Sequence, residues 1–271
     1  MSIANIRVPG NSGSRIRTMS KVNSRELLHR FYPESNVSGF SHVDGMVSFY
    51  TQITSALRSS DIVLDFGAGR GEPLQDDDVD FRRNLSNLQG KCAHLDGCDI
   101  DEAILENPFL DAATVIEPGA PLPYPDARFD LIVARWVFEH VDDPQATAHE
   151  LLRVLKPGGL IAAITPNKFG HIALAARSVP NGLHTRMLAS VQPGRKPQDV
   201  FPTRYQLNTR STLRKAFGHS SEVFITYGSS EPAYHFGSPI VYRSVRWLDK
   251  HLPAAFQPML FIYIKKRDNA S

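Results

Sequence analysis

Short runs of consecutive apolar residues alternate along the middle of the chain with segments whose apolar residues recur at helical spacing. The runs predict four strands that are buried on both faces of a sheet, over residues 62–64, 93–98, 129–134 and 159–164. A helix is predicted over residues 145–155, with Asp143 as its N-cap and Pro144 in its first turn. Strands that are separated by helices connect through right-handed crossovers, so we expect an α/β fold with a mostly parallel, doubly wound sheet.

The rest of the chain predicts further helices and a pair of strands. Helical spacing indicates helices over residues 24–31, 43–57 and 211–217. Asn208 and Thr209 are placed to cap the last of these helices, and Gly218 closes it. Residues 222–227 and 260–265 alternate or run apolar, as two paired final strands would.

Composition along the chain separates a tail from one domain. Residues 1–22 are rich in Ser, Asn, Gly and Arg and contain no acid, so we expect a flexible basic tail there. Residues 23–271 are expected to form a single domain. Its parts are N-terminal helices (23–60), a ligand-binding core (61–166), a cap or insert (167–210) and a C-terminal part of the core (211–267).

The overall composition excludes several classes of protein. Hydrophobic residues make up 42% of the 271 residues, which is enough for a packed core, and the formal net charge of +2 gives no sign of a nucleic-acid-binding surface. Cys92 and Cys98 are too few for a disulfide framework or a zinc site. No apolar signal region opens the chain, and the apolar run over residues 252–264 is broken by two prolines, so we expect a soluble, cytoplasmic protein.

The first predicted strand runs into a glycine-rich turn, Asp65-Phe66-Gly67-Ala68-Gly69-Arg70-Gly71. Glycines at the carboxyl end of a strand let a ligand approach the backbone, but this pattern alone also fits a dinucleotide site. Asp65 can reach a ligand ammonium, and Asp99, which follows the second strand, can accept hydrogen bonds from ribose hydroxyls. An insert over residues 72–87 lengthens the interval between the glycines and Asp99 beyond the ~20 residues of the dinucleotide fingerprint.

Two more motifs follow in order, Leu122-Pro123-Tyr124-Pro125-Asp126 before the third strand and Leu155-Lys156-Pro157-Gly158-Gly159 before the fourth. Over residues 61–166 the set resembles the class I S-adenosylmethionine-dependent methyltransferases, especially the small-molecule group that includes the ubiquinone-biosynthesis enzymes. The resemblance implies an enzyme with S-adenosylmethionine as its cofactor and a Rossmann-like, mostly parallel sheet with an antiparallel last strand and an inserted cap. It implies a cofactor site made of Asp65, Gly67, Ala68, Gly69, Asp99, Ile100, Glu117, Arg135 and Trp136.

The sequence departs from the family pattern at two places. Pro118 disturbs the usual pattern beside Glu117. Glu72-Pro73 and the acidic run over residues 76–80 follow the glycines, so the usual first helix is expected to be shortened or displaced. The acidic run is typical of a solvated loop, and no metal is expected.

Methyl transfer is an in-line displacement that depends mostly on alignment and exclusion of water. Trp136 and Phe138 are expected to shield the site, and His140 is the candidate for acceptor contact or general base, although it can equally be a packing residue at the start of a loop. The insert carries many cations and one acid, Asp199. Its cations are Lys168, Arg177, Arg186, Arg195, Lys196, Arg204 and Arg210. They predict either an anionic acceptor, such as a carboxylate, a phosphate or a lipid headgroup, or a solvated loop face.

The predicted function is therefore methyl transfer from S-adenosylmethionine to a small or medium, anionic or lipid-like acceptor, with the methylated atom left open. Two alternatives remain at this point: a Rossmann oxidoreductase that uses NAD, and a non-catalytic S-adenosylmethionine-binding partner protein. Nucleic acid is not expected as a substrate, because the sequence has no Asn/Asp-Pro-Pro-Tyr/Phe motif for a flipped base.

Overall fold

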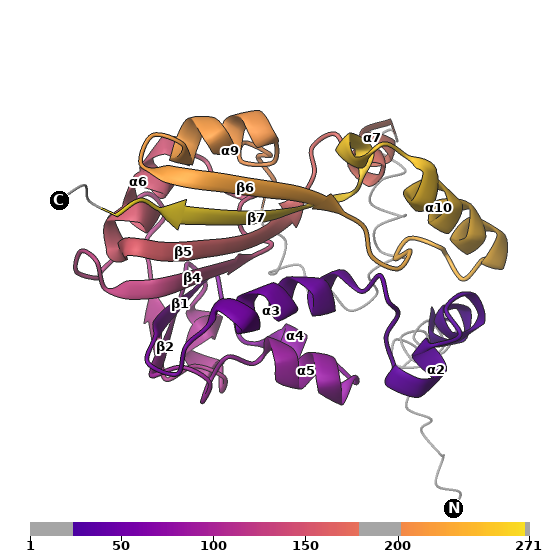
Figure 1. The fold of residues 1–271 in the computed structure, drawn as a ribbon, viewed down its shortest axis with the longest axis horizontal. Coiled ribbons are helices and arrows are strands. Elements are labelled where there is room, and N and C mark those ends of the chain that lie inside the picture. The colour runs from indigo at the N-terminus through magenta and orange to yellow at the C-terminus, as the bar shows by residue number, and fades with distance from the viewer. Residues whose placement is uncertain (1–23, 179–201, 269–271) are drawn as a thin grey trace, which may run out of the picture.

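A computed structural model describes residues 24–178 and 202–268, and its centre is one seven-stranded sheet (Figure 1). The strands lie in the order β3-β2-β1-β4-β5-β7-β6. Their bounds are Ile62–Phe66 (β1), His94–Asp99 (β2), Ala112–Val115 (β3), Phe129–Arg135 (β4), Leu155–Pro166 (β5), Ser221–Gly228 (β6) and Met259–Lys266 (β7). The pairs from β3 to β5 are parallel, whereas β7 runs antiparallel to both β5 and β6. The predicted α/β fold with a mostly parallel sheet and an antiparallel last strand is confirmed.

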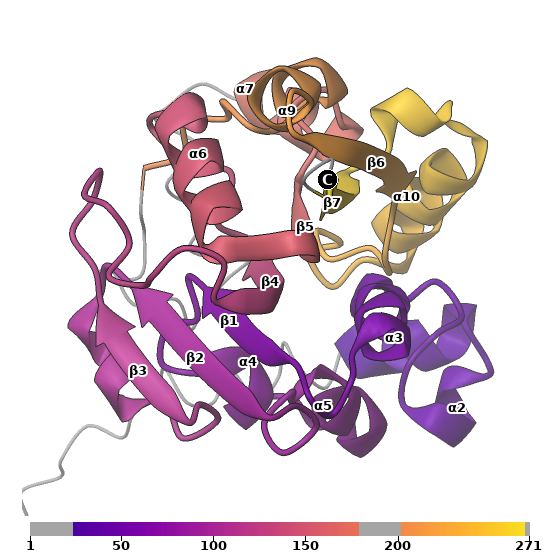
Figure 2. The same cartoon turned by 60° about the vertical axis from the view of Figure 1, so that its left-hand side comes forward.

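The helices cover both faces of the sheet, as Figure 2 shows from the edge. Residues 24–31 are helical. The other α-helices are α2 (Ser35–Ser38), α3 (Gly45–Ala56), α4 (Glu72–Gln75), α5 (Asp80–Ser86), α6 (Pro144–Val154), α7 (His171–Ser178), α9 (Arg210–Phe217) and α10 (Pro239–His251). Two short 3-10 helices are η1 (Glu102–Glu106) and η3 (Ala254–Phe256). The tail over residues 1–22 and the middle of the predicted cap lie outside the described residues.

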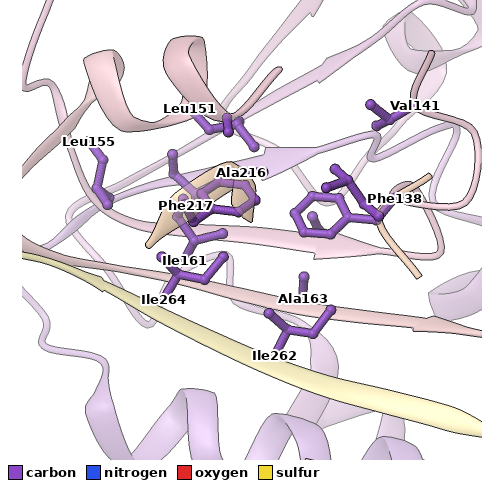
Figure 3. Close-up of a cluster of buried hydrophobic side chains, with 14 of the residues drawn as sticks. Phe138, Val141, Leu151, Leu155, Ile161, Ala163, Ala216, Phe217, Ile262 and Ile264 are labelled. Carbon is purple, nitrogen blue, oxygen red and sulfur yellow. The ribbon is translucent and has the colours of Figure 1, made fainter. Parts of the chain in front are cut away.

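Strand β5 joins two hydrophobic clusters, because successive side chains of a strand point to opposite faces of a sheet. On one face, Ile161 and Ala163 pack with residues of α6 and α9, including Leu151 and Phe217 (Figure 3). On the other face, Ala162 and Ile164 pack with α3, whose Phe49 is fully buried. Burial on both faces explains why these strands read as continuous apolar runs in the sequence.

Local signals placed several helix ends correctly. The side chain of Asp143 accepts hydrogen bonds from the backbone N–H groups of Gln145 and Ala146, which confirms the predicted N-cap of α6. Thr209 caps α9, but Asn208 does not, and the prediction that it shares the cap is wrong. The Asn208 side chain is buried and donates instead to the Thr165 hydroxyl and the Pro166 carbonyl, because the loop before α9 folds back onto the end of β5.

The segment after the glycine turn forms two short helices, α4 and α5, in place of one long one. Pro73 lies in the first turn of α4, where its missing N–H needs no partner, and α4 ends within four residues. The expectation of a shortened first helix is confirmed. The acidic run extends into the first residue of α5 and forms ion pairs with that helix, since Asp77 pairs with Arg82 and Asp80 pairs with Arg83.

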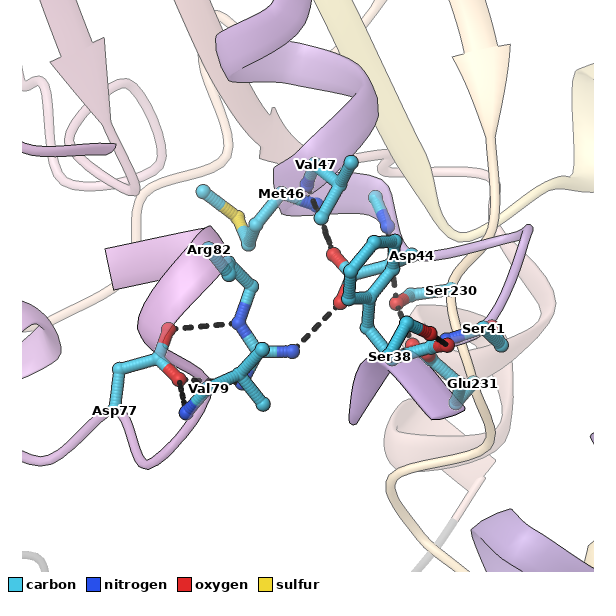
Figure 4. A network of polar contacts seen from close by, with 12 residues as sticks. Ser38, Ser41, Asp44, Met46, Val47, Asp77, Val79, Arg82, Ser230 and Glu231 are labelled. Carbon is cyan, nitrogen blue, oxygen red and sulfur yellow. Dashed lines mark hydrogen bonds and ion pairs between the residues drawn. The ribbon is translucent and has the colours of Figure 1, made fainter. Parts of the chain in front are cut away.

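A polar network holds the start of α3 against α5 and against the loop after β6 (Figure 4). Asp44 is the N-cap of α3, and its Oδ1 accepts hydrogen bonds of 2.9 Å from the N–H groups of Met46 and Val47. Arg82 donates from Nη1 to Asp44 Oδ2 at 2.6 Å and from Nε to Asp77 Oδ2 at 2.7 Å. Burial raises the pKa of Asp44, and the Arg82 guanidinium opposes that rise. The network therefore depends on Arg82 to neutralise a carboxylate whose side chain is 3% exposed.

Replacing Arg82 with Ala is expected to lower the free energy of unfolding by about 3 kcal/mol, since it leaves the buried Asp44 carboxylate without its charged partner. Urea unfolding followed by circular dichroism at pH 7 measures the loss. Arg83→Ala is the matched control. It breaks an ion pair whose side chains are 39% and 82% exposed and one hydrogen bond to the Asp77 carbonyl, so a loss of about 1 kcal/mol is expected. Equal losses for the two variants would contradict this account of the network.

Candidate active site

The candidate site lies at the carboxyl ends of β1, β2 and β4. In the sheet, β1 pairs with β2 on one side and with β4 on the other, so the direction of winding reverses at β1. A reversal of this kind opens a crevice at the strand ends, because the connections on its two sides leave in opposite directions. The glycine-rich turn follows β1 at this crevice.

The glycine turn adopts a backbone that side chains would strain. Gly67, Gly69 and Gly71 have φ angles of +76°, +54° and +76°. A Cβ on Gly67 would lie 2.3 Å from Val137 Cγ2, so the turn packs tightly against the loop after β4 on that side. A Cβ on Gly69 would meet only Asp99 Oδ2, at 4.0 Å. The turn is therefore packed at Gly67 and open at Gly69, where a ligand can approach the backbone.

Asp99 ends β2 and is held by the backbone around it. Its Oδ2 accepts a hydrogen bond from Gly69 N, and its Oδ1 accepts one from Asp101 N, both at 2.9 Å. A carboxylate oxygen accepts two hydrogen bonds, so each oxygen keeps capacity for a ligand hydroxyl. Asp101, and not Asp99, is the N-cap of η1, because its side chain accepts a hydrogen bond from Ala103 N. Ile100, the next residue, is 44% exposed and offers an apolar surface beside the carboxylate.

Asp65 and Arg135 carry opposite charges at the ends of β1 and β4, close to Tyr50 of α3. The three residues line one cavity together with Ala68 and Gly71. Burial raises the pKa of Asp65 to about 6, the charge of Arg135 opposes that rise, and the charge of Asp99 adds to it. Among the residues that the structure describes, neither the Asp65 carboxylate nor the Arg135 guanidinium has a hydrogen-bond or ion-pair partner. The sequence indicated the two charges separately, but not that they share one cavity.

Glu117 and Trp136 lie at the two flanks of the site. Glu117 is exposed just after β3, and its neighbour Ile116 donates from its N–H to the Asp99 carbonyl at 2.9 Å. Trp136 has a φ of +58°, an uncommon backbone for a bulky residue, while its N–H donates to Ile164 O at 2.9 Å. The turn after β4 thus begins in a strained conformation beside the glycine turn.

The loop after β4 holds residues whose positions differ from expectation. Phe138 is fully buried and stacks on Phe217 with 6.1 Å between ring centroids, so the expectation that it shields the site is wrong; the strand-to-loop turn directs it into the core. His140 is half-buried, and its Nδ1 lies 3.1 Å from the Pro202 carbonyl. His140 therefore faces the segment that leads into α9.

A buried polar chain, which the sequence did not reveal, ties that segment to the strand ends. Glu139 is 5% exposed, and its Oε2 accepts a hydrogen bond from the Thr165 hydroxyl at 2.9 Å. The same hydroxyl accepts one from Asn208 Nδ2 at 2.6 Å, and the Glu139 carbonyl accepts one from Arg204 N at 2.7 Å. The Glu139-His140 pair was a signal for this position, but its partners come from distant parts of the chain.

Only some cations of the predicted cap lie within the described residues. Arg204 pairs with Asp142 at 2.6 Å, Arg210 lies over the Tyr227 ring at 5.8 Å, and Lys168 N donates to the Asn208 carbonyl. Arg177 belongs to α7. Arg186, Arg195, Lys196 and Asp199 lie outside the described residues.

The structure describes residues 24–178 and 202–268. Within these ranges, no group of three or more His, Cys, Asp or Glu residues is placed to hold a metal ion. No helix within them is long and apolar enough to cross a membrane.

Comparisons with known proteins agree with this geometry. Residues 64–163 match the family model described as methyltransferase domain. The ubiquinone/menaquinone biosynthesis C-methyltransferase UbiE of Chromobacterium violaceum is 28% identical over 126 residues, which cover 44% of this chain and 48% of that protein. The 27-O-demethylrifamycin SV methyltransferase of Amycolatopsis mediterranei is 32% identical over 113 residues, 39% of each chain. The chain thus spans less than half the length of these relatives.

Among solved structures, a methyltransferase from Methanosarcina mazei aligns with a TM-score of 0.48 and 18% identity, covering 80% of this chain and 98% of its own. The matched region, residues 64–163, begins within β1, just before the glycine turn, and ends within β5. It contains the glycine turn, Asp99 and the motifs at residues 122–126 and 155–159. Residues 64–163 of this chain therefore match a methyltransferase domain, in agreement with the resemblance that the sequence motifs indicate.

Proposed function

We propose that this protein is an enzyme that transfers the methyl group of S-adenosylmethionine to a small or medium acceptor. The observation that carries the proposal is the pair of opposite charges, Asp65 and Arg135, in one cavity at the switch point of the sheet. The methionine end of the cofactor carries an ammonium and a carboxylate. Asp65 is the proposed partner of the ammonium, and Arg135 is the proposed partner of the carboxylate.

The other residues of the crevice fit the remaining parts of this cofactor. Asp99 has hydrogen-bond capacity for the two ribose hydroxyls, and the open side of Gly69 leaves room for the sugar beside the backbone. Ile100 offers an apolar surface to the adenine face. Glu117, at the end of the next strand, is the candidate for the adenine edge. Gly67 and Ala68 form the floor of the turn, and their N–H groups donate to the Cys98 carbonyl.

When bound, the cofactor supplies a sulfonium methyl group that is already electrophilic. The task of the protein is to hold that group in line with the acceptor and to exclude water, which together supply about 7–11 kcal/mol in well-oriented reactions. Trp136 is the candidate for closing the site beside the β4 end. His140 is the candidate base for an acceptor that must lose a proton: if its Nδ1–H donates to the Pro202 carbonyl, then Nε2 carries the lone pair.

The acceptor is proposed to be anionic, because the sequence concentrates cations in residues 167–210, the segment that follows β5 in the chain. The cations that suggest an anionic acceptor belong to a different part of the chain from the residues of the cofactor site. The described ends of this segment lie at the same edge of the sheet as the cofactor site, since α7 follows β5 directly and Lys168 N donates to the Asn208 carbonyl before α9.

Arg135→Leu is expected to weaken binding of S-adenosylhomocysteine about 10- to 100-fold, because a hydrogen bond to a charged group contributes about 1.5–3 kcal/mol. Binding of 5′-methylthioadenosine, which has the same nucleoside but no amino acid, should be unchanged. Arg135→Lys serves as the conservative control and should recover part of the loss. Titration calorimetry with both ligands makes the comparison, and equal weakening of the two would argue against a carboxylate contact.

The pKa of about 6 at Asp65 gives cofactor binding a pH dependence. The ammonium of the ligand is attracted only to the ionised carboxylate, so affinity for S-adenosylhomocysteine should fall as the pH drops through 6. In Asp65→Asn this dependence between pH 5 and pH 7.5 should vanish, while 5′-methylthioadenosine should show none in either protein.

The same pKa fixes the sign of an effect on stability. A folded-state pKa above the ordinary value means that burying the ionised carboxylate opposes folding, and that this opposition grows as the pH rises. Ligand-free Asp65→Asn should therefore unfold at a higher temperature than the unmodified protein at pH 7.5 and at the same temperature at pH 4. A lower melting temperature at pH 7.5 would contradict the assignment.

Methyl transfer itself is tested by incubating the full chain with S-adenosylmethionine labelled in the methyl group and an extract of small molecules and lipids. The expected result is one or a few labelled products that are retained by an anion exchanger, with no label when Asp99→Asn is used. Binding of S-adenosylhomocysteine without binding of NAD separates this function from that of an oxidoreductase. Absence of label from every product, with cofactor binding intact, would favour the non-catalytic alternative.

A further inference from the structure

Helix α10 presents an apolar ridge to solvent. Ile240 and Trp247 are 73% and 61% exposed, and they are seven residues apart, which places them two turns apart on one side of the helix. The opposite side packs inward, where Tyr242 is 1% exposed and clusters with Leu27 and Tyr32. The exposed ridge is therefore not a fraying end, because α10 is anchored along its inner side.

Cations flank this ridge. Arg243 and Lys250 are exposed and lie three residues after Ile240 and Trp247, hence on the same side of the helix. Within the described chain, neither cation has a hydrogen-bond or ion-pair partner. We call these four residues, Ile240, Arg243, Trp247 and Lys250, the outer face of α10.

The only acid of α10 points away from this face. Asp249 has a side chain that is 10% exposed, and its Oδ1 lies 3.4 Å from His171 Nε2 of α7. A third cation, Arg246, lies over the Tyr32 ring at 4.7 Å from its centroid. The outer face thus combines large apolar side chains with uncompensated positive charge, and its complement must be negatively charged at the surface and apolar beneath it.

The outer face lies near the edge of the sheet that carries the candidate active site. In Figure 1, α7 and α10 lie beyond the carboxyl end of β5. Hydrogen bonds from Asn167, at the end of β5, to the carbonyls of Ala255 and Gln257 join this edge to the turn after α10. A partner that binds the outer face is therefore held near the carboxyl end of β5.

We propose that the outer face of α10 docks on the surface of an anionic lipid bilayer. Trp247 and Ile240 enter the boundary between headgroups and acyl chains, where tryptophan is enriched, and Arg243 and Lys250 contact the lipid phosphates. A single convex helix with flanking cations suits a flat anionic surface, since a bilayer needs no complementary groove. The helix is too short to cross the bilayer and lies along it.

Flotation of the full chain with lipid vesicles tests the proposal. The protein should float with vesicles that contain phosphatidylglycerol, should bind far less to phosphatidylcholine alone, and should be released by high salt. Each cation near an anionic surface contributes about fivefold to binding, so Arg243→Gln with Lys250→Gln should reduce partitioning at least tenfold. Ile240→Ser with Trp247→Ser should reduce it by a similar factor through the lost apolar area.

Phe224→Ser with Lys265→Gln is the matched control. Phe224 is 55% exposed on β6 and Lys265 is exposed on β7, so this pair removes one apolar group and one cation far from α10 and should leave partitioning unchanged. Thermal melts of all variants check that each remains folded. If the control pair weakens binding as much as the α10 pairs do, the outer face is not the contact.

Fluorescence gives a second readout that needs no variant in α10. Trp136 and Trp247 are the two tryptophans of the chain, so Trp136→Phe leaves Trp247 as the only reporter. Its emission should shift to shorter wavelength on anionic vesicles and be quenched by brominated acyl chains. An unchanged spectrum, or a concentration-dependent dimer in sedimentation that Ile240→Ser with Trp247→Ser abolishes, would overturn the proposal, the latter by showing a second copy on this face.

Discussion

Everything in this structure depends on the need to bury both faces of a parallel sheet. β4 and β5 pair in parallel through apolar residues, so each strand must be covered on two sides, by α6 and α9 on one and by α3 and α5 on the other. Parallel strands also share a direction, which brings their carboxyl ends to one edge. The candidate site lies at that edge. The connections there leave the strands toward opposite faces of the sheet, so a crevice stays open between them.

The site itself works against stability, as functional sites often do. The Asp65 carboxylate, near the end of β1, has no hydrogen-bond partner among the described residues, and its raised pKa reflects the opposition of burial to its charge. Trp136 begins the neighbouring turn at a positive φ. Both features are tolerated because the surrounding sheet is packed on two faces.

The antiparallel end of the sheet sets the surroundings of that edge. β7 lies between β5 and β6 in the sheet. The chain passes the carboxyl end of β5 twice, once through the segment before α9 and once through α10. The buried chain of Glu139, Thr165 and Asn208 fastens the first of these passages to the strand ends. Helix α10 carries the outer face of cations and apolar side chains. The candidate active site and the proposed membrane-docking surface would therefore lie at the same end of the molecule.

Interactions within a few residues could be predicted from the sequence. The N-cap Asp143, the glycine turn after β1 and the apolar strands β1, β2, β4 and β5 each depend on their own neighbours, and each was predicted close to its observed place. The strand β3 was missed, because Ala112–Val115 is a short, half-buried edge strand with no apolar run to mark it.

Only the tertiary structure decided which distant residues meet. Asn208 reads locally as a cap, yet its amide is bound by a strand that lies 42 residues earlier, and Phe138 reads as a site residue, yet it stacks in the core. Asp65 and Arg135 line one cavity because β1 and β4 are neighbours in the sheet and not in the chain. The physical reason is the same in each case: caps and turns are local hydrogen bonds, whereas the charge pair and the buried network exist only after strands far apart in sequence have paired.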